Sequence, residues 1–379
     1  LRFAFVILVL AYLAPAMSNA QETIYDEEKV PQYTLPDPLL TNEGTPITSP
    51  AQWPDRRAEV LKLFKGHVFG TMPEFDGKHA VSIDAKVTQD LIVTFAVDSS
   101  LPESRHIQGH LREITLKLRP KNQVEANAPE IQSMVPLELR LLVVTPVPIK
   151  KNGKPQKYPV FLGYNFLGNH TLTSIKEVSL AEIWNAKTRQ RVIPDEKQRG
   201  ERINRWPIGM MLQRGMGLVT LHYGDVDPDF DDGFKNGAHR LFPDLQNRSD
   251  NWSAIGAWAW GLHRVLDYLE TDPHVNANSV VAFGHSRLGK TSLWAGATDE
   301  RLVAVISNNS GCGGAALSRR RFGESVKRIN TTFPHWFCKQ HREYNDNEDA
   351  CPVDHHMLLS ISAPRGVYVA SAEGCLLYT

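Results

Sequence analysis

One stretch of the sequence, residues 279–297, constrains the fold more than any other. The β-branched apolar run at residues 280–283 is typical of a buried strand, and the residues after it favour a helix. Between the two, Ser286 is flanked by Gly284 and Gly289. This order predicts a nucleophile elbow, a sharp strand-to-helix turn that exposes a serine hydroxyl above a sheet. The spacing is G-x-S-x-x-G rather than the usual G-x-S-x-G, so an incidental serine in such a turn is the alternative interpretation.

The second half of the chain alternates strand-like and helix-like patterns. Short apolar runs typical of buried strands occur at residues 159–163, 217–222, 280–283, 302–307 and 367–370. Helical patterns separate them, the longest at 251–270, and this alternation predicts a parallel sheet covered on both faces. Residues 80–118 and 137–147 alternate apolar and polar side chains, which indicates antiparallel strands at one edge. We therefore expect an α/β fold, a three-layer αβα sandwich with a mainly parallel sheet and antiparallel N-terminal strands.

The first 20 residues have the features of a secretory signal peptide. An apolar run at 3–14 follows Arg2, and the small residues Ser18 and Ala20 precede the expected cleavage site. The run is short for a membrane span, so we favour cleavage over a membrane anchor. The sequence thus predicts a secreted or periplasmic protein that is not membrane-bound after cleavage.

Composition and motif spacing exclude several kinds of partner. The chain has 42 basic and 42 acidic residues, whereas nucleic acids and anionic membranes require a cationic surface. The acidic segment 225–233 lacks the glycine and glutamate of a calcium-binding EF-hand loop, so we expect a surface loop. The chain has four cysteines, Cys312, Cys338, Cys351 and Cys375, and their spacing matches no zinc motif. Secretion would permit disulfides, and Cys338 and Cys351 are the candidate pair. We expect neither a metal nor a cofactor.

Residues 284–291 resemble the G-[CH]-S-R-x-G-K elbow of the glucuronoyl esterases, carbohydrate esterase family 15. Other segments similar to bacterial members are 33–40, 64–73, 165–170, 310–316, 334–338 and 352–359. The resemblance implies a metal-free α/β-hydrolase that cleaves the ester between 4-O-methyl-glucuronic acid of xylan and lignin alcohols. We expect its esterase domain at residues 51–379, preceded by a proline-rich extended arm at 21–50, and a monomer in solution.

The same resemblance implies roles for individual residues. Ser286 would be the nucleophile, and Arg287 would stabilise the negative charge that develops on the ester oxygen. Lys290 would contact the hydroxyl groups of the uronate, and Glu324 matches a substrate-binding glutamate of the family.

The acid and the base of the catalytic triad are less well matched. Many members carry the acid where this chain has Asn309, which cannot supply the negative charge, so Glu373 is the candidate acid. No histidine follows Glu373, although the family places its base near the C-terminus. The sequence therefore predicts an esterase domain that is incomplete at residue 379, with its base beyond that point. His335, His355 and His356 are conceivable substitutes.

Two other functions remain open on these residues. One is an acetyl-xylan esterase or general carboxylesterase on the same fold, which would not depend on Lys290. The other is a catalytically dead protein that binds carbohydrate, which the asparagine at position 309 and the missing histidine would explain.

Overall fold

The structure, a computed structural model, describes most of the chain after the predicted signal peptide. The described residues are 23–74, 76–98, 100, 103–121, 135–185 and 187–372. Three features of the sequence analysis lie outside them: the segment 1–20, Glu373 and Cys375.

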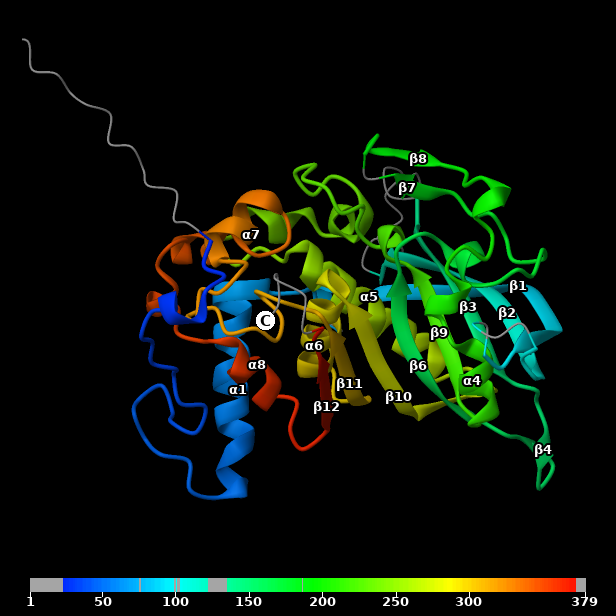
Figure 1. Cartoon of the computed structure of the whole chain (residues 1–379), viewed down its shortest axis with the longest axis horizontal. Coiled ribbons are helices and arrows are strands. Elements are labelled where there is room, and N and C mark those ends of the chain that lie inside the picture. Colours follow the sequence, from blue (N-terminus) through cyan, green and yellow to red (C-terminus); the bar gives the residue numbers. More distant parts are fainter. Residues whose placement is uncertain are drawn as a thin grey trace, which may run out of the picture.

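An eight-stranded sheet forms the centre of the fold, in the order β1-β2-β3-β9-β6-β10-β11-β12 (Figure 1). Its strands are β1 (Val81–Ala96), β2 (His106–Pro120), β3 (Leu137–Pro146), β6 (Tyr158–Asn165), β9 (Gly217–His222), β10 (Val275–His285), β11 (Leu302–Asn308) and β12 (Gly366–Ala370). The neighbouring strands β9, β6, β10, β11 and β12 pair in parallel. The strands β1, β2 and β3 pair antiparallel with one another, and β3 pairs antiparallel with β9. The predicted mixed sheet is confirmed. Two hairpins lie outside it: β4 (Lys150–Lys151) with β5 (Lys154–Pro155), and β7 (Ile183–Asn185) with β8 (Gln190–Val192).

Helices cover both faces of this sheet. The α-helices of the described residues are α1 (Trp53–Phe64), α4 (Ile208–Gln213), α5 (Ala254–Leu269), α6 (Arg287–Thr298), α7 (Val326–Thr332) and α8 (His355–Ser360). Successive side chains of β3 point to opposite faces. Val143 joins the hydrophobic cluster of α1, α5 and α6, whereas Leu142 and Val144 join the cluster of α4. The fold is therefore the predicted three-layer sandwich. Of the helices in the described ranges, none is both long and apolar enough to cross a membrane.

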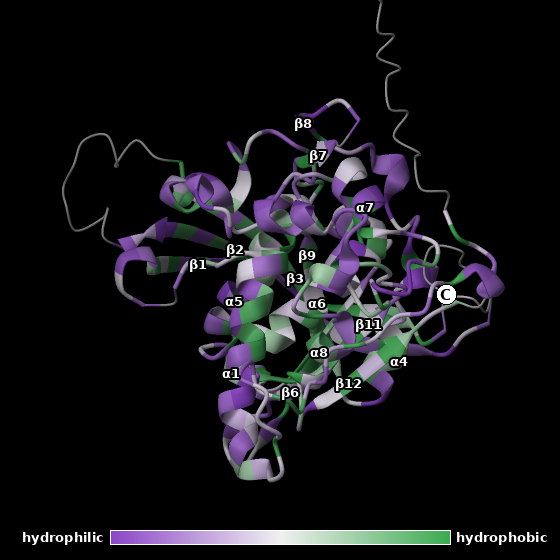
Figure 2. Cartoon of the chain, turned by 90° about the vertical axis from the view of Figure 1, so that its left-hand side faces the viewer, coloured by the Kyte–Doolittle hydropathy of each residue, from purple (hydrophilic) through white to green (hydrophobic). Residues whose placement is uncertain are grey.

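The helix α5 runs through the larger hydrophobic cluster. Ser253 caps its N-terminus by accepting a hydrogen bond from the Gly256 amide, and 14 of the 16 residues of the helix are buried. The helix therefore belongs to the interior of the fold, and Figure 2 shows hydrophobic residues, in green, gathered on the elements in the middle of the molecule. Trp252, Trp258 and Trp260 are buried, so the prediction that they belong to the core is confirmed.

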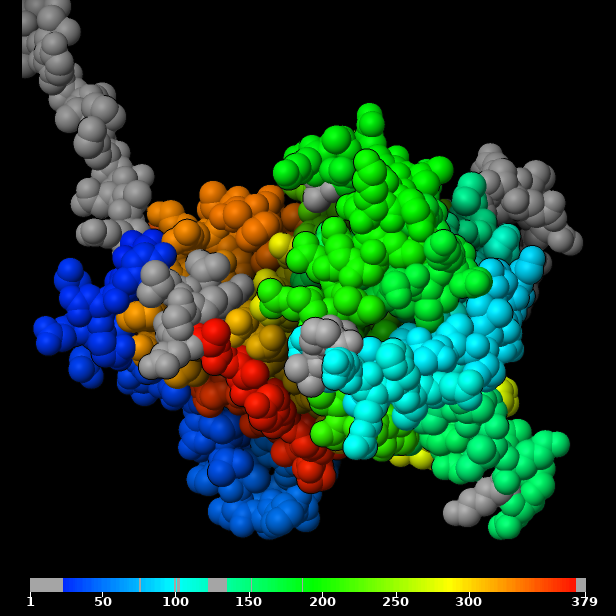
Figure 3. All heavy atoms as spheres, turned by 45° about the vertical axis from the view of Figure 1, so that its right-hand side comes forward, coloured from blue at the N-terminus to red at the C-terminus, as the bar shows by residue number. Residues whose placement is uncertain are grey.

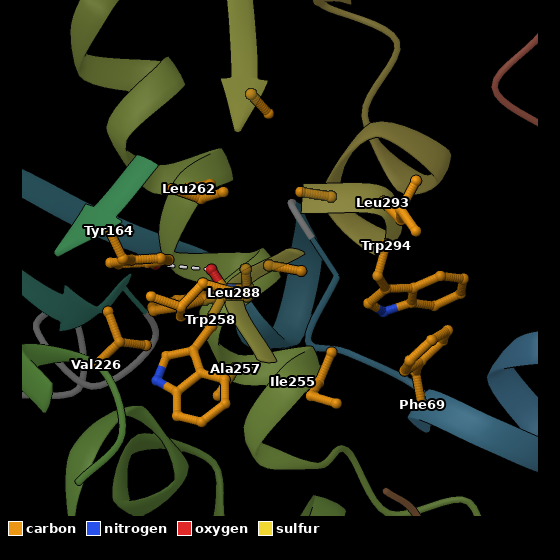
Figure 4. Close-up of a cluster of buried hydrophobic side chains, with 14 of the residues drawn as sticks. Phe69, Tyr164, Val226, Ile255, Ala257, Trp258, Leu262, Leu288, Leu293 and Trp294 are labelled. Carbon is orange, nitrogen blue, oxygen red and sulfur yellow. Dashed lines mark hydrogen bonds between the residues drawn. The ribbon is translucent and has the colours of Figure 1, made fainter. Parts of the chain in front are cut away.

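One hydrogen bond joins this helix to the parallel part of the sheet. The hydroxyl of Tyr164 on β6 donates to the carbonyl oxygen of Trp258 over 2.7 Å, within the cluster drawn in Figure 4. The tyrosine hydroxyl can come this close to the helix because residue 261 is a glycine. A Cβ at Gly261 would lie 2.4 Å from the Tyr164 oxygen. Burial raises the pKa of Tyr164 well above its usual value. The core below the elbow is thus fixed by a polar contact as well as by packing.

The segment 23–49 lies against the surface of the domain and contains no α-helix or strand, only a short 3-10 turn. Ile24 forms a β-bridge with Phe322, and His356 Nε2 bonds the carbonyl oxygen of Pro36 over 2.8 Å. Figure 3 shows this segment in blue beside the orange segment that follows β11. The contact gives His356 a structural role.

The candidate disulfide between Cys338 and Cys351 is not formed in the structure. Both are buried free thiols, and the Cys338 sulfur lies 3.9 Å from the carbonyl oxygen of Gly66. Burial raises the pKa of Cys338 to about 11 and that of Cys351 to about 12, which keeps both thiols protonated and poorly reactive.

The junction of β10 and α6 is a tight turn at Ser286. Ser286 has φ 57° and ψ −128°, a conformation that few non-glycine residues adopt. Its amide donates to the carbonyl oxygen of Asn308 at the end of β11 over 2.9 Å. The turn brings the strand very close to the helix, since a Cβ on Gly284 would lie 1.9 Å from the Leu288 carbonyl oxygen. Glycine is therefore required at position 284.

We expect Gly284→Ala to destabilise the protein by about 3 kcal/mol or more, because backbone atoms must separate to admit the methyl group. Urea unfolding would measure the free-energy change. The matched control is Gly66→Ala, where an added Cβ meets no atom within 4 Å. Equal stabilities of the two variants would contradict the steric account.

Candidate active site

The carboxyl ends of β10, β11 and β12 meet at the Ser286 turn. Ser286 is half-buried and is joined to β11 through its amide, as described above. The next residue of that segment, Asn309, accepts a hydrogen bond from the Ala372 amide on its Oδ1 over 2.8 Å. Asn309 therefore ties β11 to the end of β12. The candidate acid Glu373 follows Ala372 directly in the sequence, although it lies outside the described residues.

Arg287, the first residue of α6, sits between one carboxylate and three aromatic rings. Its Nη1 lies 3.1 Å from Oδ2 of Asp229. Its guanidinium carbon lies 5.4 Å, 5.9 Å and 5.1 Å from the ring centres of Phe166, Phe333 and Trp336. These distances are within the range of cation–π attraction. The side chain is 23% exposed, so it is accessible from solvent while its position is constrained.

The expectation that residues 225–233 form a surface loop is wrong for the first part of the segment. Asp225 and Asp227 are 3% and 4% exposed, and only the second part reaches the surface. The segment turns beneath α5, where Trp258 Nε1 donates to the carbonyl oxygens of Tyr223 and Asp227. Burial raises the pKa of Asp225 to about 6. The many acidic residues of this segment therefore led to the wrong expectation that all of it is exposed.

Asp229, in this same segment, was not identified from the sequence. Its Oδ1 accepts hydrogen bonds from Trp336 Nε1 over 2.7 Å and from His335 Nε2 over 3.1 Å. Its position in the sequence could have indicated a role in the site, because its segment directly follows the parallel strand β9. Ligand sites of such sheets lie beyond the carboxyl ends of the strands.

Lys290 and Glu324 form a second charged group beside the elbow. The Lys290 ammonium group is 1% exposed, donates to the carbonyl oxygen of Ser310 and lies 3.9 Å from Oε2 of Glu324. Burial lowers the pKa of Lys290, which the nearby carboxylate opposes, and burial raises the pKa of Glu324. The structure therefore brings together both residues for which the resemblance implies substrate binding.

The remaining candidate histidines each have a hydrogen-bond partner. His335 Nε2 bonds Asp229, and His355 Nδ1 lies 3.1 Å from the Ser318 hydroxyl oxygen. The exposed His285 has its Nδ1 3.2 Å from Asn308 Nδ2. Within the described part of the chain, no group of three or more His, Cys, Asp or Glu residues is arranged to hold a metal ion.

Comparison with known proteins gives consistent matches. The sequence model of the family described as "Glucuronyl esterase, fungi" matches residues 202–377. Carbohydrate esterase MZ0003, from an unknown prokaryotic organism, is 41% identical over 92% of this chain and 75% of its own length. The 4-O-methyl-glucuronoyl methylesterase of Schizophyllum commune is 26% identical over 88% of this chain, which spans 66% of that enzyme.

Solved structures agree with these matches. A structure described as a promiscuous CE15 esterase from a marine bacterial metagenome is 40% identical, has a TM-score of 0.74, and aligns over 93% of this chain and 82% of its own. A glucuronoyl esterase from Solibacter usitatus is 36% identical, has a TM-score of 0.75, and aligns over 92% of this chain and 81% of its own. The similarity extends over nearly all of the chain.

We expect Glu324→Gln to destabilise the protein by about 2 kcal/mol at pH 7, because it leaves the buried Lys290 ammonium without an anionic neighbour. Adding Lys290→Met should recover much of this loss, and urea unfolding of the two single variants and the double variant would measure the coupling. Glu343→Gln makes the same change at an exposed position and is the control. Additive effects of the two substitutions would contradict an interaction between them.

Proposed function

Because this chain belongs to carbohydrate esterase family 15, the glucuronoyl esterases, we propose that it is a secreted serine esterase acting on 4-O-methyl-glucuronoyl esters. Membership implies a carboxylic-ester hydrolase. The proposed substrates are the ester linkages between glucuronoxylan and lignin alcohols. The observation that carries the proposal is the Ser286 turn, which begins α6 with a serine and a cationic side chain side by side.

In the proposed reaction, a general base takes the proton of the Ser286 hydroxyl as its oxygen attacks the ester carbonyl carbon. The carbonyl oxygen then becomes an oxyanion, and the Arg287 guanidinium donates hydrogen bonds to it. The N-terminus of α6 adds a second favourable contribution, because the positive end of a helix dipole stabilises a nearby anion. Both effects act more strongly on the tetrahedral intermediate than on the neutral ester, as catalysis requires. The lignin alcohol then leaves with that proton, and water hydrolyses the acyl-enzyme to release the uronate and restore the serine.

The uronate part of the substrate is assigned to Lys290 and Glu324. A sugar ring presents hydroxyl groups that can both donate and accept hydrogen bonds, and this pair supplies an ammonium donor and a carboxylate acceptor 3.9 Å apart. The Schizophyllum commune relative, named for its action on 4-O-methyl-glucuronoyl methyl esters, supports this choice of substrate. A simple acetyl ester would make no use of the pair.

We assign the acid of the triad to Glu373. The usual position of the acid after β11 is occupied by Asn309, whose side chain accepts the Ala372 amide. This hydrogen bond brings the chain that leads into Glu373 to the end of β11, one strand away from the Ser286 turn. A carboxylate there would orient the base and stabilise its protonated form.

We expect Ser286→Ala to lower the turnover of benzyl glucuronate by the intact protein about 1000-fold or more, because the nucleophile is lost. Ester hydrolysis followed by chromatography would measure it. Ser279→Ala, on the same strand but away from the elbow, is the control and should retain activity.

Turnover of acetyl esters alone, unaffected by Lys290→Ala, would instead support a general or acetyl-xylan esterase. Binding of an aldouronic acid with no turnover would support a non-catalytic protein.

We expect Glu373→Gln to lower kcat about 100-fold or more, since a neutral side chain cannot stabilise a protonated base. Asn309→Asp in the Glu373→Gln background should restore part of the loss, because it returns a carboxylate to the usual position and keeps the acceptor for Ala372. Steady-state kinetics of the three variants would test the assignment. An unchanged kcat in Glu373→Gln would exclude Glu373 as the acid.

A further inference from the structure

The acidic segment after β9 supplies a carboxylate to the candidate active site, and neither the sequence motifs nor the family resemblance assigned it a role. We propose that Asp229 is a positioning residue, which holds the Arg287 guanidinium in the orientation needed to stabilise the oxyanion. The inference rests on the proposed function, because it assigns to Asp229 a role in the same reaction.

Both oxygens of the Asp229 carboxylate have defined partners. Oδ2 pairs with Arg287 Nη1 over 3.1 Å, and Oδ1 accepts from Trp336 and His335 over 2.7 Å and 3.1 Å. The side chain is 6% exposed. A buried carboxylate with two hydrogen bonds at one oxygen and an ion pair at the other has one favoured orientation, because rotation separates it from these partners. The Asp229 carboxylate therefore has a fixed position from which it can orient the Arg287 guanidinium.

The backbone at Asp229 is also fixed, from the interior of the domain. Asp229 has φ 61°, a left-handed conformation that costs free energy in a residue other than glycine. Its amide donates to Oδ1 of Asp227 over 2.9 Å, and Oδ2 of Asp227 lies 3.2 Å from Nε2 of the fully buried His239. These contacts hold the segment in the strained conformation that turns the Asp229 side chain toward α6.

Arg287 depends on this carboxylate for its direction. Attraction to the faces of Phe166, Phe333 and Trp336 confines the guanidinium but does not fix its rotation, because it is not a directional bond to one N–H. Arg287 Nε is buried and has no hydrogen-bond partner among the described residues. Within that part of the chain, Asp229 supplies the one carboxylate that forms an ion pair with the guanidinium. It engages Nη1 and leaves other N–H donors for the oxyanion.

The aromatic residues depend on the same carboxylate. The rings of Phe333 and Trp336 are stacked, with centres 3.7 Å apart and planes 2° from parallel. Since Trp336 Nε1 donates to Asp229, the carboxylate fixes this stacked pair as well as the cation that lies against it. Replacing Asp229 with a neutral residue is therefore expected to loosen the guanidinium without removing it.

The test is a double-mutant cycle between Asp229→Asn and Arg287→Ala in the intact protein, with benzyl glucuronate as substrate. Asp229→Asn should lower kcat about 10- to 100-fold and change KM less than about threefold, because a misplaced oxyanion donor weakens transition-state binding more than substrate binding. In the Arg287→Ala background, the same substitution should change kcat less than about threefold. Asp231→Asn, the same change at an exposed position of the segment, is the control. Melting temperatures of all variants would show whether they are folded.

An equal loss of kcat from Asp229→Asn in both backgrounds would overturn the inference, since Asp229 would then act independently of Arg287. So would an unchanged kcat in Asp229→Asn while Ser286→Ala is inactive, an outcome that leaves the proposed function intact. If the wild-type protein fails to hydrolyse the ester, the proposed function fails instead. The crystal structure of Asp229→Asn then decides the positioning role: Arg287 displaced from the three rings supports it, and Arg287 in its original orientation contradicts it.

Discussion

The close contact between β10 and α6 at Gly284 is the constraint on which the site depends. With the strand and the first turn of the helix this near, the connection must be made at Ser286 in a left-handed conformation. Gly289 matters for a related reason, because a Cβ there would lie 3.1 Å from the Cβ of Ser310 in the segment after β11. The two glycines therefore fit α6 between its own strand and the next segment, and the serine occupies the turn that results.

The charges on α6 are balanced by segments that are distant in the sequence. Arg287 pairs with Asp229 from the segment after β9, and Lys290 lies beside Glu324 from the segment before α7. A buried charge without a partner costs several kcal/mol, so the buried Lys290 requires a carboxylate beside it. The candidate active site is thus assembled by electrostatic pairing across three parts of the chain, and its geometry depends on the whole fold.

Much of the fold could be predicted from the sequence because strand and helix periodicities are local properties. The parallel strands, the antiparallel edge, the buried tryptophans and the sharp strand-to-helix turn at Ser286 all follow from short patterns and are confirmed. The burial of Asp229 could not be predicted, because it arises from contacts with His335 and Trp336, more than 100 positions away. The sequence also left the pairing of Cys338 with Cys351 open, since spacing in the sequence does not report the direction of a thiol. The assignment of Glu373 stays a prediction.

The central claim is that Ser286 is an activated nucleophile, and covalent labelling tests it most directly. The intact protein would be treated with a fluorophosphonate, which reacts with activated serine hydroxyls, then digested and examined by peptide mass spectrometry. The account predicts a single phosphonylated peptide that contains residues 284–291 with the adduct on Ser286, and no such adduct after denaturation before labelling. Labelling of a different serine, or no labelling of the folded protein, would contradict it.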